Sequence, residues 1–159
     1  MPNHKQYISQ GEVRRLFDYR EDGVLINRLT RSPRAVKGFV AGGPNKSNGY
    51  YRVLINRKTF QLSRLIWIWH YGDIPHQMEI DHIDRNPANN KIENLRPVTK
   101  RQNEYNKPRQ GCNYENGKWR ASIYDHGKNV YLGLYKTKKE AQQAYFEYAA
   151  KLHGEYSCA

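Results

Sequence analysis

One stretch of the chain decides both its fold and its chemistry: Asp81-His82-Ile83-Asp84-Arg85-Asn86-Pro87-Ala88-Asn89-Asn90-Lys91-Ile92-Glu93-Asn94-Leu95. An acid and a histidine stand side by side at its start, and Asn94 follows the histidine by twelve positions. Asn103 comes nine positions later. A carboxylate, an imidazole and amides are the groups that a site for phosphodiester hydrolysis uses, as a cation ligand, a general base and neutral orienting groups.

The flanking residues predict a strand, a long loop, a second strand and a helix. Met78–Ile80 is expected to be the first strand, ending at Asp81-His82, and Leu95–Val98 the second. Thr99-Lys100-Arg101-Gln102 has the spacing of a helix-capping box, so a helix that carries Asn103 is expected to begin there.

Each residue type at these positions has a chemical role to fill. His82 is suited to be the general base, because the unperturbed pKa of histidine lies near neutrality. Asp81 points to the opposite side of the strand end, so it can bind a metal while His82 faces the attacking water. Asn103 offers a second oxygen ligand to a hard cation such as Mg²⁺. Asn94, at the start of the second strand, is expected to hydrogen-bond across the hairpin and fix the loop.

The composition indicates small modules and a polyanionic partner. Apolar residues make up 38% of the 159 residues, which favours several thin cores over one large one. The net charge is +12, and residues 1–75 carry 13 Lys/Arg against 5 Asp/Glu, a net of +8. Nucleic acid is the partner that this excess favours, with the N-terminal half making most of the salt-sensitive contacts. The alternative is a merely soluble basic protein.

The cysteines and the apolar runs indicate a cytoplasmic protein. Cys112 and Cys158 fit neither a disulfide framework nor a zinc site, so a reducing compartment is expected. The run Leu65–Trp69 is too short to span a membrane, and the N-terminus does not resemble a signal peptide. The other histidines, namely His4, His70, His76, His126 and His153, lack a comparable constellation and are expected to be surface or structural residues, with His76 nearest the site.

The N-terminal residues 1–74 are expected to form a basic sheet and helix region that contacts DNA. The predicted elements are a helix from Ser9 through Phe17, a strand at Gly23–Leu29, an irregular segment at 30–48, a hairpin at 50–62 that turns at Asn56–Lys58, and a helix from Ser63 to Tyr71 closed by Gly72. Trp67 and Trp69 are expected to pack in the core rather than stack on bases. The DNA-contacting residues predicted in and after this region are Arg52, Arg57, Lys58, Arg64 and Arg96.

The C-terminal residues 108–159 predict three antiparallel strands with one helix on their inner face. Alternation along Lys118–Tyr124 puts Trp119, Ala121 and Ile123 on the inner side. The helix capped by Thr137 carries an apolar stripe from Ala141 to Leu152. The opposite face is polar and basic and suits a DNA groove; its predicted contacts are Lys118, Arg120, Ser122, Tyr124, Asn129 and Tyr131.

Residues 50–107 resemble the His-Asn-His (HNH) endonuclease family, with the spacing found in phage and group I intron homing endonucleases. The resemblance rests on Asp81-His82, Asn89-Asn90, Glu93-Asn94-Leu95 and Asn103. It implies a ββα-metal core, metal ligation by Asp81 and Asn103, general-base catalysis by His82 and an orienting role for Asn94. It also implies a phage- or intron-encoded protein of a bacterial host. Related phage enzymes carry a histidine where this chain has Ser63.

Residues 111–156 resemble the DNA-binding domain of the ethylene-response-factor (Apetala) class. The resemblance rests on Gly117–Ala121, Tyr131–Gly133, Thr137, Glu140-Ala141 and Ala144-Tyr145. It implies that the sheet reads DNA. Members of that class use several arginines on the sheet face, whereas this chain has Asn113, Ser122, Tyr124 and Asn129, so a target sequence does not carry over. A module that only packs on the nuclease is the alternative.

Together these features predict an α+β protein in three parts, with a ββα-metal nuclease core at 75–107 between the regions 1–74 and 108–159. The predicted function is site-specific, metal-dependent cleavage of double-stranded DNA of the homing type. Mg²⁺ is the expected metal, Mn²⁺ a substitute, and zinc, a membrane and a small-molecule substrate are not expected. The alternatives are a DNA-binding regulator with a decayed nuclease fold and an RNA-directed nuclease. Nicking by a monomer and paired cuts by a DNA-assembled dimer both stay open.

Overall fold

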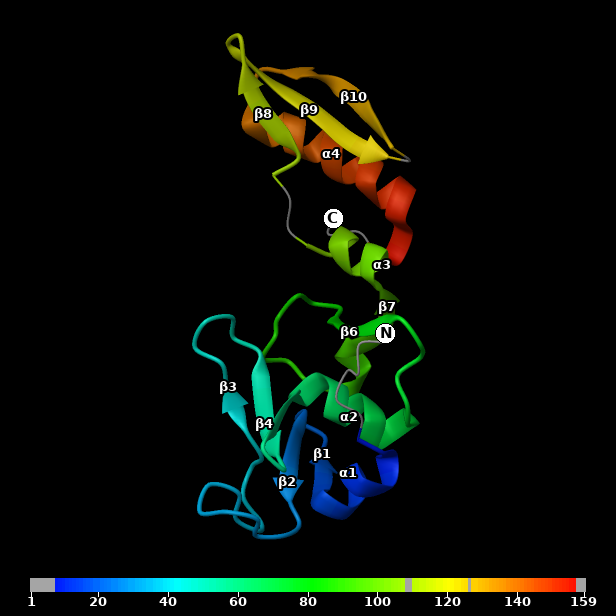
Figure 1. The fold of residues 1–159 in the computed structure, drawn as a ribbon. Coiled ribbons are helices and arrows are strands. Elements are labelled where there is room, and N and C mark those ends of the chain that lie inside the picture. The colour runs from blue at the N-terminus through cyan, green and yellow to red at the C-terminus, as the bar shows by residue number, and fades with distance from the viewer. Residues whose placement is uncertain (1–7, 108–109, 126, 157–159) are drawn as a thin grey trace. The chain divides into compact units, whose positions relative to one another are not determined.

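The computed structural model describes residues 8–107, 110–125 and 127–156. The chain divides into two compact units, Met1–Thr99 and Lys100–Ala159, each with helices and small sheets (Figure 1). Among the described residues, every helix is too short or too polar to cross a membrane. His4, His126 and Cys158 lie outside the described residues.

The N-terminal unit begins with a capped helix and a hairpin. Helix α1 (Gln10–Leu16) starts at Ser9, whose Oγ accepts a hydrogen bond from the Glu12 N–H at 3.2 Å. The prediction that this helix includes Phe17 is wrong, because Phe17 has extended backbone and begins strand β1 (Phe17–Arg20). Strand β1 pairs antiparallel with β2 (Val24–Asn27), where the sequence had predicted only one strand.

A second sheet follows in the order β3-β4-β5. The predicted hairpin is confirmed as β4 (Tyr51–Ile55) and β5 (Lys58–Gln61). Asn56 and Arg57 form its turn with φ of 48° and 63°, the left-handed backbone that a tight hairpin needs. The segment expected to be irregular contributes β3 (Gly43–Pro44), which pairs with β4.

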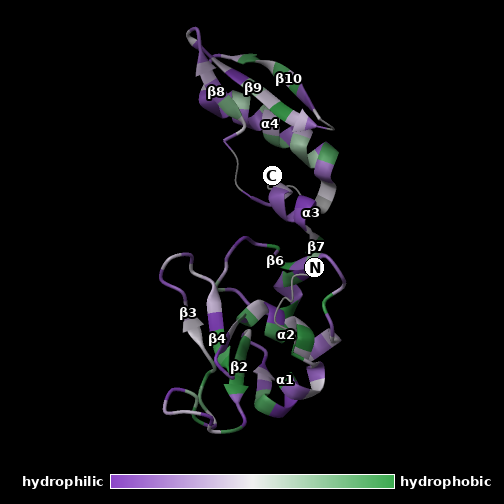
Figure 2. Ribbon diagram, viewed as in Figure 1, coloured by the Kyte–Doolittle hydropathy of each residue, from purple (hydrophilic) through white to green (hydrophobic). Residues whose placement is uncertain are grey.

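Helix α2 (Leu62–Tyr71) packs its apolar side on these sheets and ends at Gly72, as predicted. Leu65 and Ile66 are fully buried in a core that spans both sheets. Trp67 and Trp69 pack against the same core, and the Trp69 Nε1–H donates to the Phe17 carbonyl at 3.1 Å. The prediction of core packing for both tryptophans is therefore confirmed. Strand β2 and parts of α2 are among the hydrophobic segments of this unit (Figure 2).

The central stretch follows the predicted order. Strand β6 (Met78–His82) pairs antiparallel with β7 (Leu95–Thr99), and helix α3 (Lys100–Tyr105) comes next in the chain. The long loop ends in a short 3₁₀ helix, η1 (Ile92–Asn94). Asn94 therefore closes η1 and does not start the strand as predicted.

The C-terminal unit has the predicted sheet and helix. Strands β8 (Cys112–Glu115), β9 (Lys118–Asp125) and β10 (Lys128–Tyr135) form an antiparallel sheet in the order β10-β9-β8, and η2 (Gly154–Tyr156) ends the described chain. Helix α4 (Lys138–His153) lies along this sheet (Figure 1) and begins with a complete capping box between Thr137 and Glu140.

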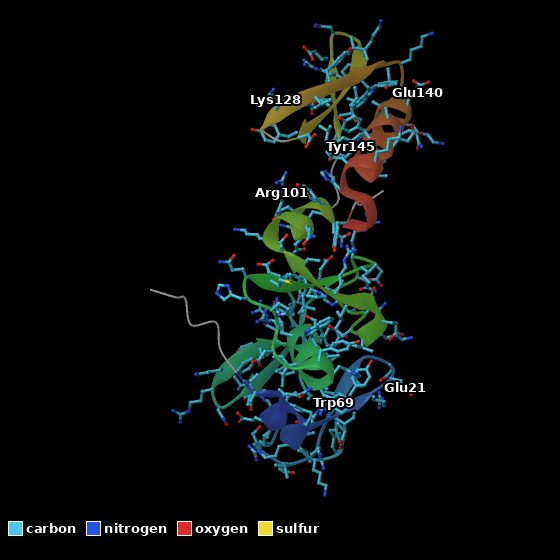
Figure 3. The ribbon with its side chains drawn as sticks, turned by 90° about the vertical axis from the view of Figure 1, so that its right-hand side faces the viewer. Glu21, Trp69, Arg101, Lys128, Glu140 and Tyr145 are labelled. Atoms are coloured by element: carbon cyan, nitrogen blue, oxygen red, sulfur yellow. The ribbon has the colours of Figure 1, made fainter. Side chains whose placement is uncertain are left out.

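The two faces of this sheet differ as the alternation predicts. Ala121 and Ile123 are buried against Ala141, Tyr145 and other residues of the helix stripe; Figure 3 labels Tyr145 on α4. A bulge between Tyr131 and Gly133 shifts the register of β10, so that Leu134 stands opposite Arg120 on the exposed face.

Candidate active site

Asp81 and His82 lie at the end of β6, opposite Arg96 and Leu95 of β7. Both side chains are buried, with 8% and 4% of each residue exposed. The Asp81 Oδ2 accepts a hydrogen bond from the Arg96 Nε at 3.1 Å, and only 14% of the Arg96 side chain is exposed. The sequence predicted a DNA contact for Arg96, whereas its guanidinium here neutralises the carboxylate of the site.

Asn90 fixes the ring of His82. The His82 Nε2 lies 3.1 Å from the Asn90 Oδ1, and Asn90 is itself buried. The Asn90 Nδ2 donates to the carbonyls of Pro87 and Ala88, which determines that the amide oxygen, and not the amide nitrogen, faces the ring. An amide oxygen only accepts, so in this contact the His82 Nε2–H is the donor.

Asn94 and Asp84 hold the loop that follows His82. The Asn94 Oδ1 accepts from the backbone N–H of Asp84 at 3.1 Å, and its Nδ2 donates to the Asp84 Oδ1 at 2.9 Å and to the Asn89 carbonyl at 2.8 Å. The Asn89 Nδ2 donates to the Asp84 Oδ2 at 2.7 Å. Asn94 therefore makes the cross-hairpin contacts that the sequence predicts for it, through a carboxylate that the sequence did not single out.

The electrostatics of Asp84 follow from this network. Burial raises the pKa of Asp84, but hydrogen bonds from Asn89, from the backbone of Asn86 and from Asn94 favour the charged form and outweigh it. The pKa of Asp84 is thus held below its ordinary value, and the carboxylate is ionised at neutral pH.

The β1–β2 sheet of the same unit contacts the loop that follows His82. Gly23, at the β1–β2 turn, has φ of 85°, and a Cβ there would lie 2.5 Å from the backbone nitrogen of Lys91 and 2.6 Å from the carbonyl carbon of Asn90. The Tyr19 hydroxyl accepts from the Ile92 N–H at 3.2 Å. These contacts set the position of Asn90, and through it the ring of His82.

An aromatic side chain borders the histidine. The ring of Tyr50, just before β4, has its centroid 5.7 Å from that of His82. Tyr50 is partly open to solvent while His82 is buried. The more exposed ring of Tyr50 therefore lies beside the buried imidazole.

Both residues that the sequence predicts as metal ligands have oxygen atoms of the type that a hard divalent cation binds. Asp81, on β6, has a carboxylate, and Asn103, half-buried on α3 of the C-terminal unit, has a side-chain amide oxygen. The described residues contain no cluster of three His, Cys, Asp or Glu side chains that could hold a metal. Such a cation would therefore keep most of its ligands as water and phosphate oxygens, which is the usual coordination of Mg²⁺ in phosphoryl chemistry. Ser63, where related phage enzymes carry histidine, is buried in α2.

The cations predicted to contact DNA from the N-terminal unit fall into two groups. Arg52, Arg57 and Lys58 are exposed on β4, β5 and their turn. Arg64 is half-buried on α2, and burial lowers the pKa of its guanidinium. The first group is accessible to a phosphate backbone, while Arg64 borders the core.

The six predicted contacts of the C-terminal unit share the open face of its sheet. Five are exposed and Ser122 is half-buried: Lys118, Arg120, Ser122, Tyr124, Asn129 and Tyr131. The Arg120 guanidinium lies 5.5 Å from the Tyr131 ring centroid and 3.4 Å from the Glu115 carboxylate. A shallow pocket of about 350 Å³ lies on this face, lined by Lys118, Arg120, Tyr131 and Leu134 among others.

Sequence reasoning missed three contributors to the site: Asp84, Asn90 and Arg96 in its pairing role. The Asn-rich loop pointed to Asn90 only as part of a resemblance. The register of β6 against β7 is what brings Arg96 opposite Asp81. That register depends on the length of the intervening loop, which a residue-by-residue interpretation does not give.

Comparison with known proteins assigns the domain that contains this site. Residues 60–105 match the family model described as HNH endonuclease. An uncharacterised HNH endonuclease of Acanthamoeba polyphaga mimivirus is 32% identical over 113 residues, which cover 67% of this chain and 60% of the relative. A Bacillus subtilis protein, named as an SPbeta prophage-derived HNH homing endonuclease, is 32% identical over 83 residues, covering 52% and 47% of the two chains.

A solved structure of the HNH homing endonuclease I-HmuI, described in terms of DNA binding and cleavage, is also similar. It shares 27% identity with a TM-score of 0.43, over 57% of this chain and 50% of that one. The chain thus spans about half to three-fifths of the length of the proteins that it matches. The matched residues include the β6–β7 hairpin with Asp81, His82 and Asn94, and the chain carries an HNH endonuclease domain at residues 60–105.

Proposed function

We propose that the chain is a metal-dependent DNA endonuclease that hydrolyses phosphodiester bonds in double-stranded DNA. One observation carries the proposal: a buried histidine, whose Nε2 lies 3.1 Å from a buried amide oxygen, stands beside a carboxylate within the residues that match the HNH endonuclease family. A histidine held in one tautomer by a buried amide is prepared to accept a proton in one direction.

In this proposal His82 is the general base. Its Nε2–H stays on the Asn90 oxygen, and its Nδ1 takes the proton from the water that attacks phosphorus. Asn94 acts through position, because its three hydrogen bonds hold Asp84 and the loop that carries Asn90. The roles of His82 and Asn94 are those that the sequence predicts.

Asp81 and Asn103 are the residues that would hold the divalent metal, with Mg²⁺ as the natural ion and Mn²⁺ as a substitute. Arg96 donates to the Asp81 Oδ2, so in this proposal the carboxylate keeps its arginine partner while it would bind the metal. When bound, the metal supplies neutralisation of charge on the phosphate and the leaving oxygen.

Target choice in this proposal comes from outside the nuclease domain. The exposed cations of the N-terminal unit contact phosphates, and the open face of the C-terminal sheet reads base edges as a β-sheet of the ethylene-response-factor class would. Two of the similar proteins are named as homing endonucleases, which supports site-specific cleavage of the homing type.

Cleavage of supercoiled plasmid tests the proposal. With Mg²⁺ or Mn²⁺ the wild-type protein should convert plasmid to nicked or linear forms, and EDTA should abolish this. His82→Ala should lower the rate by a factor on the order of 10² to 10⁴, the usual share of a general base. The matched control is His76→Ala, an exposed histidine of the same unit, which should keep the wild-type rate.

Persistent cutting by folded His82→Ala protein would contradict the assignment of His82 as the general base. Equal cutting in EDTA would contradict the dependence on a metal. Binding of DNA, seen as slower migration in a gel, without any cleavage would favour the rival function, a regulator with a decayed nuclease fold. Faster cleavage of RNA than of duplex DNA at matched salt would show that RNA is the preferred substrate.

A further inference from the structure

The N-terminal unit has a long segment without acidic residues. From residue 23 to residue 72 the chain carries nine Lys/Arg and no Asp or Glu. Four of the nine lie in one loop between β2 and β3, at Arg28, Arg31, Arg34 and Lys37. A continuous segment of one charge sign attracts a polyanion and repels a second copy of itself.

The cations of this loop differ in their contacts. The Arg31 guanidinium is used internally, because it donates to the Asn27 Oδ1 at 2.9 Å and to the Leu54 carbonyl at 3.2 Å. Arg34 and Lys37 are exposed, and within the described part of the chain neither has an ion-pair partner. The loop thus carries two exposed cations that have no ion-pair partner among the described residues.

The base of the loop is closed by a buried asparagine. Asn27 is 1% exposed, and both its backbone N–H and its Nδ2 donate to the Phe39 carbonyl, at 2.9 and 3.0 Å. The Gly38 N–H donates back to the Asn27 carbonyl at 2.7 Å, and the Phe39 N–H to the Val36 carbonyl at 3.2 Å. Three hydrogen bonds therefore hold the backbone of Phe39, and a fourth holds the neighbouring Gly38.

The side chain on this fixed backbone points to solvent. Phe39 is 69% exposed, the largest exposed fraction among the large hydrophobic residues of this unit, and its neighbour Val40 is exposed as well. An exposed phenyl ring gives up the free energy of burial, and Phe39 lies two residues along the chain from the exposed cation Lys37. Proteins that kink DNA insert such apolar side chains between base steps while flanking cations contact the phosphates.

We propose that the loop of residues 28–40 is a wedge for duplex DNA, with Phe39 entering a base step and Arg34 and Lys37 on the adjacent phosphates. This inference rests on the proposed function, since it assigns a contact to the same DNA outside the nuclease domain. The lack of acidic residues over 23–72 favours a nucleic acid over a second copy of the chain.

Plasmid unwinding tests the wedge directly. Closed circular plasmid is relaxed by a type IB topoisomerase in EDTA with saturating protein, and the change in linking number is read on a gel. His82→Gln serves as a second, cleavage-deficient background. An inserted ring unstacks a base step, so the wild-type chain should shift the topoisomer distribution, and Phe39→Ala should lose most of the shift. Phe39→Leu keeps an apolar wedge and should keep it.

The matched control is Tyr71→Ala, because Tyr71 is an aromatic residue of the same unit with a similar exposed fraction of 64%. It should leave the topoisomer shift unchanged. The double variant Arg34→Gln/Lys37→Gln should lower the slope of log Kd against log salt by about 1.8, the release expected for two phosphate contacts. Unchanged melting curves would show that Phe39→Ala folds normally, as an exposed position should.

An equal topoisomer shift with Phe39→Ala would overturn the wedge, as would a Phe39-dependent dimer in light scattering. Phe39-dependent binding to phosphatidylserine vesicles with no Phe39 effect on DNA would also overturn it, in favour of a membrane surface. The failure of this inference can be told apart from the failure of the proposed function. If the plasmid is cleaved but its unwinding does not depend on Phe39, the wedge alone is wrong. If the wild-type chain neither cleaves nor binds DNA, the proposed nuclease function is wrong.

Discussion

At the scale of single residues, Asp84 is one of the side chains that hold the active-site loop in place. Its two carboxylate oxygens accept hydrogen bonds from Asn86, Asn89 and Asn94. Among the residues of the HNH resemblance, His82 is proposed to act in the chemistry, whereas Asp84 holds the loop that follows it. Its depressed pKa is a measurable sign of this role.

Asp84→Asn should destabilise the chain by about 1 kcal/mol at neutral pH, a modest figure because the group is partly exposed. A carboxyl group with a depressed folded-state pKa stabilises above its unfolded pKa, ordinarily 3.8, and loses this contribution as the pH falls through the folded-state value. The difference between wild type and variant should therefore shrink below about pH 3.8. Urea unfolding between pH 2.5 and 7 measures it.

The control for this prediction is Asp18→Asn. Asp18 has a weak surface pairing with Arg28 at 3.6 Å, so its loss should change stability little at any pH. A pH-independent difference between wild type and Asp84→Asn would contradict the assignment of the stabilisation to the charged form.

At the scale of elements, local signals were predictable and long-range contacts were not. The capping box of α4 lies within four residues, so Thr137 and Glu140 alone predict it. Strand β1 was missed because Phe17 also fits the helix pattern, and only burial in the shared core draws it into a hairpin. The contact of Gly23 with the Asn90–Lys91 backbone joins segments far apart in the chain, and no local pattern contains it.

The two helix caps offer a paired test of local stability. Thr137→Ala removes the side-chain acceptor for the Glu140 N–H, and Ser9→Ala removes the acceptor for the Glu12 N–H. Each loss should cost about 1 kcal/mol in its own helix. Hydrogen exchange followed by mass spectrometry should show about fivefold faster exchange in α4 for the first variant and in α1 for the second.

Each cap variant is the control for the other. Because the two helices pack in separate hydrophobic clusters, exchange in α1 should not respond to Thr137→Ala. Faster exchange throughout the chain in either variant would show that the two units unfold together.

At the scale of the whole molecule, the chain combines two units with separate cores and different charge patterns. The predicted three-part division stays a prediction, whereas residues 1–99 form one compact unit that contains both the basic sheets and the β6–β7 hairpin. The nuclease hairpin is therefore supported by the sheets that carry the cations, which explains why Tyr19, Gly23 and Tyr50 contact it. In the proposed function, target preference comes from the C-terminal unit, whose sheet has its own exposed face.

Arg120 offers the best test of the proposal that the C-terminal unit sets target preference while the nuclease domain cuts. The Tyr131 ring and the Glu115 carboxylate hold its guanidinium over the open face of the sheet, in a position to contact a base edge. One good arginine contact to guanine contributes about 1–3 kcal/mol to discrimination between bases. Arg120→Gln should therefore lower the preference for the best plasmid site over random sites about tenfold or more.

The cutting rate on saturated plasmid should stay within about twofold of wild type, because Arg120 makes no contact that the proposed chemistry needs. Sequencing of cleavage ends from a complex DNA library measures the preference for each variant. The matched control is Lys151→Gln, which removes one positive charge from an exposed position of α4 and should leave the distribution of ends unchanged. An unchanged distribution with Arg120→Gln would mean that the open face of the C-terminal sheet does not read bases through this arginine. A matching loss of cutting in both variants would instead point to charge alone.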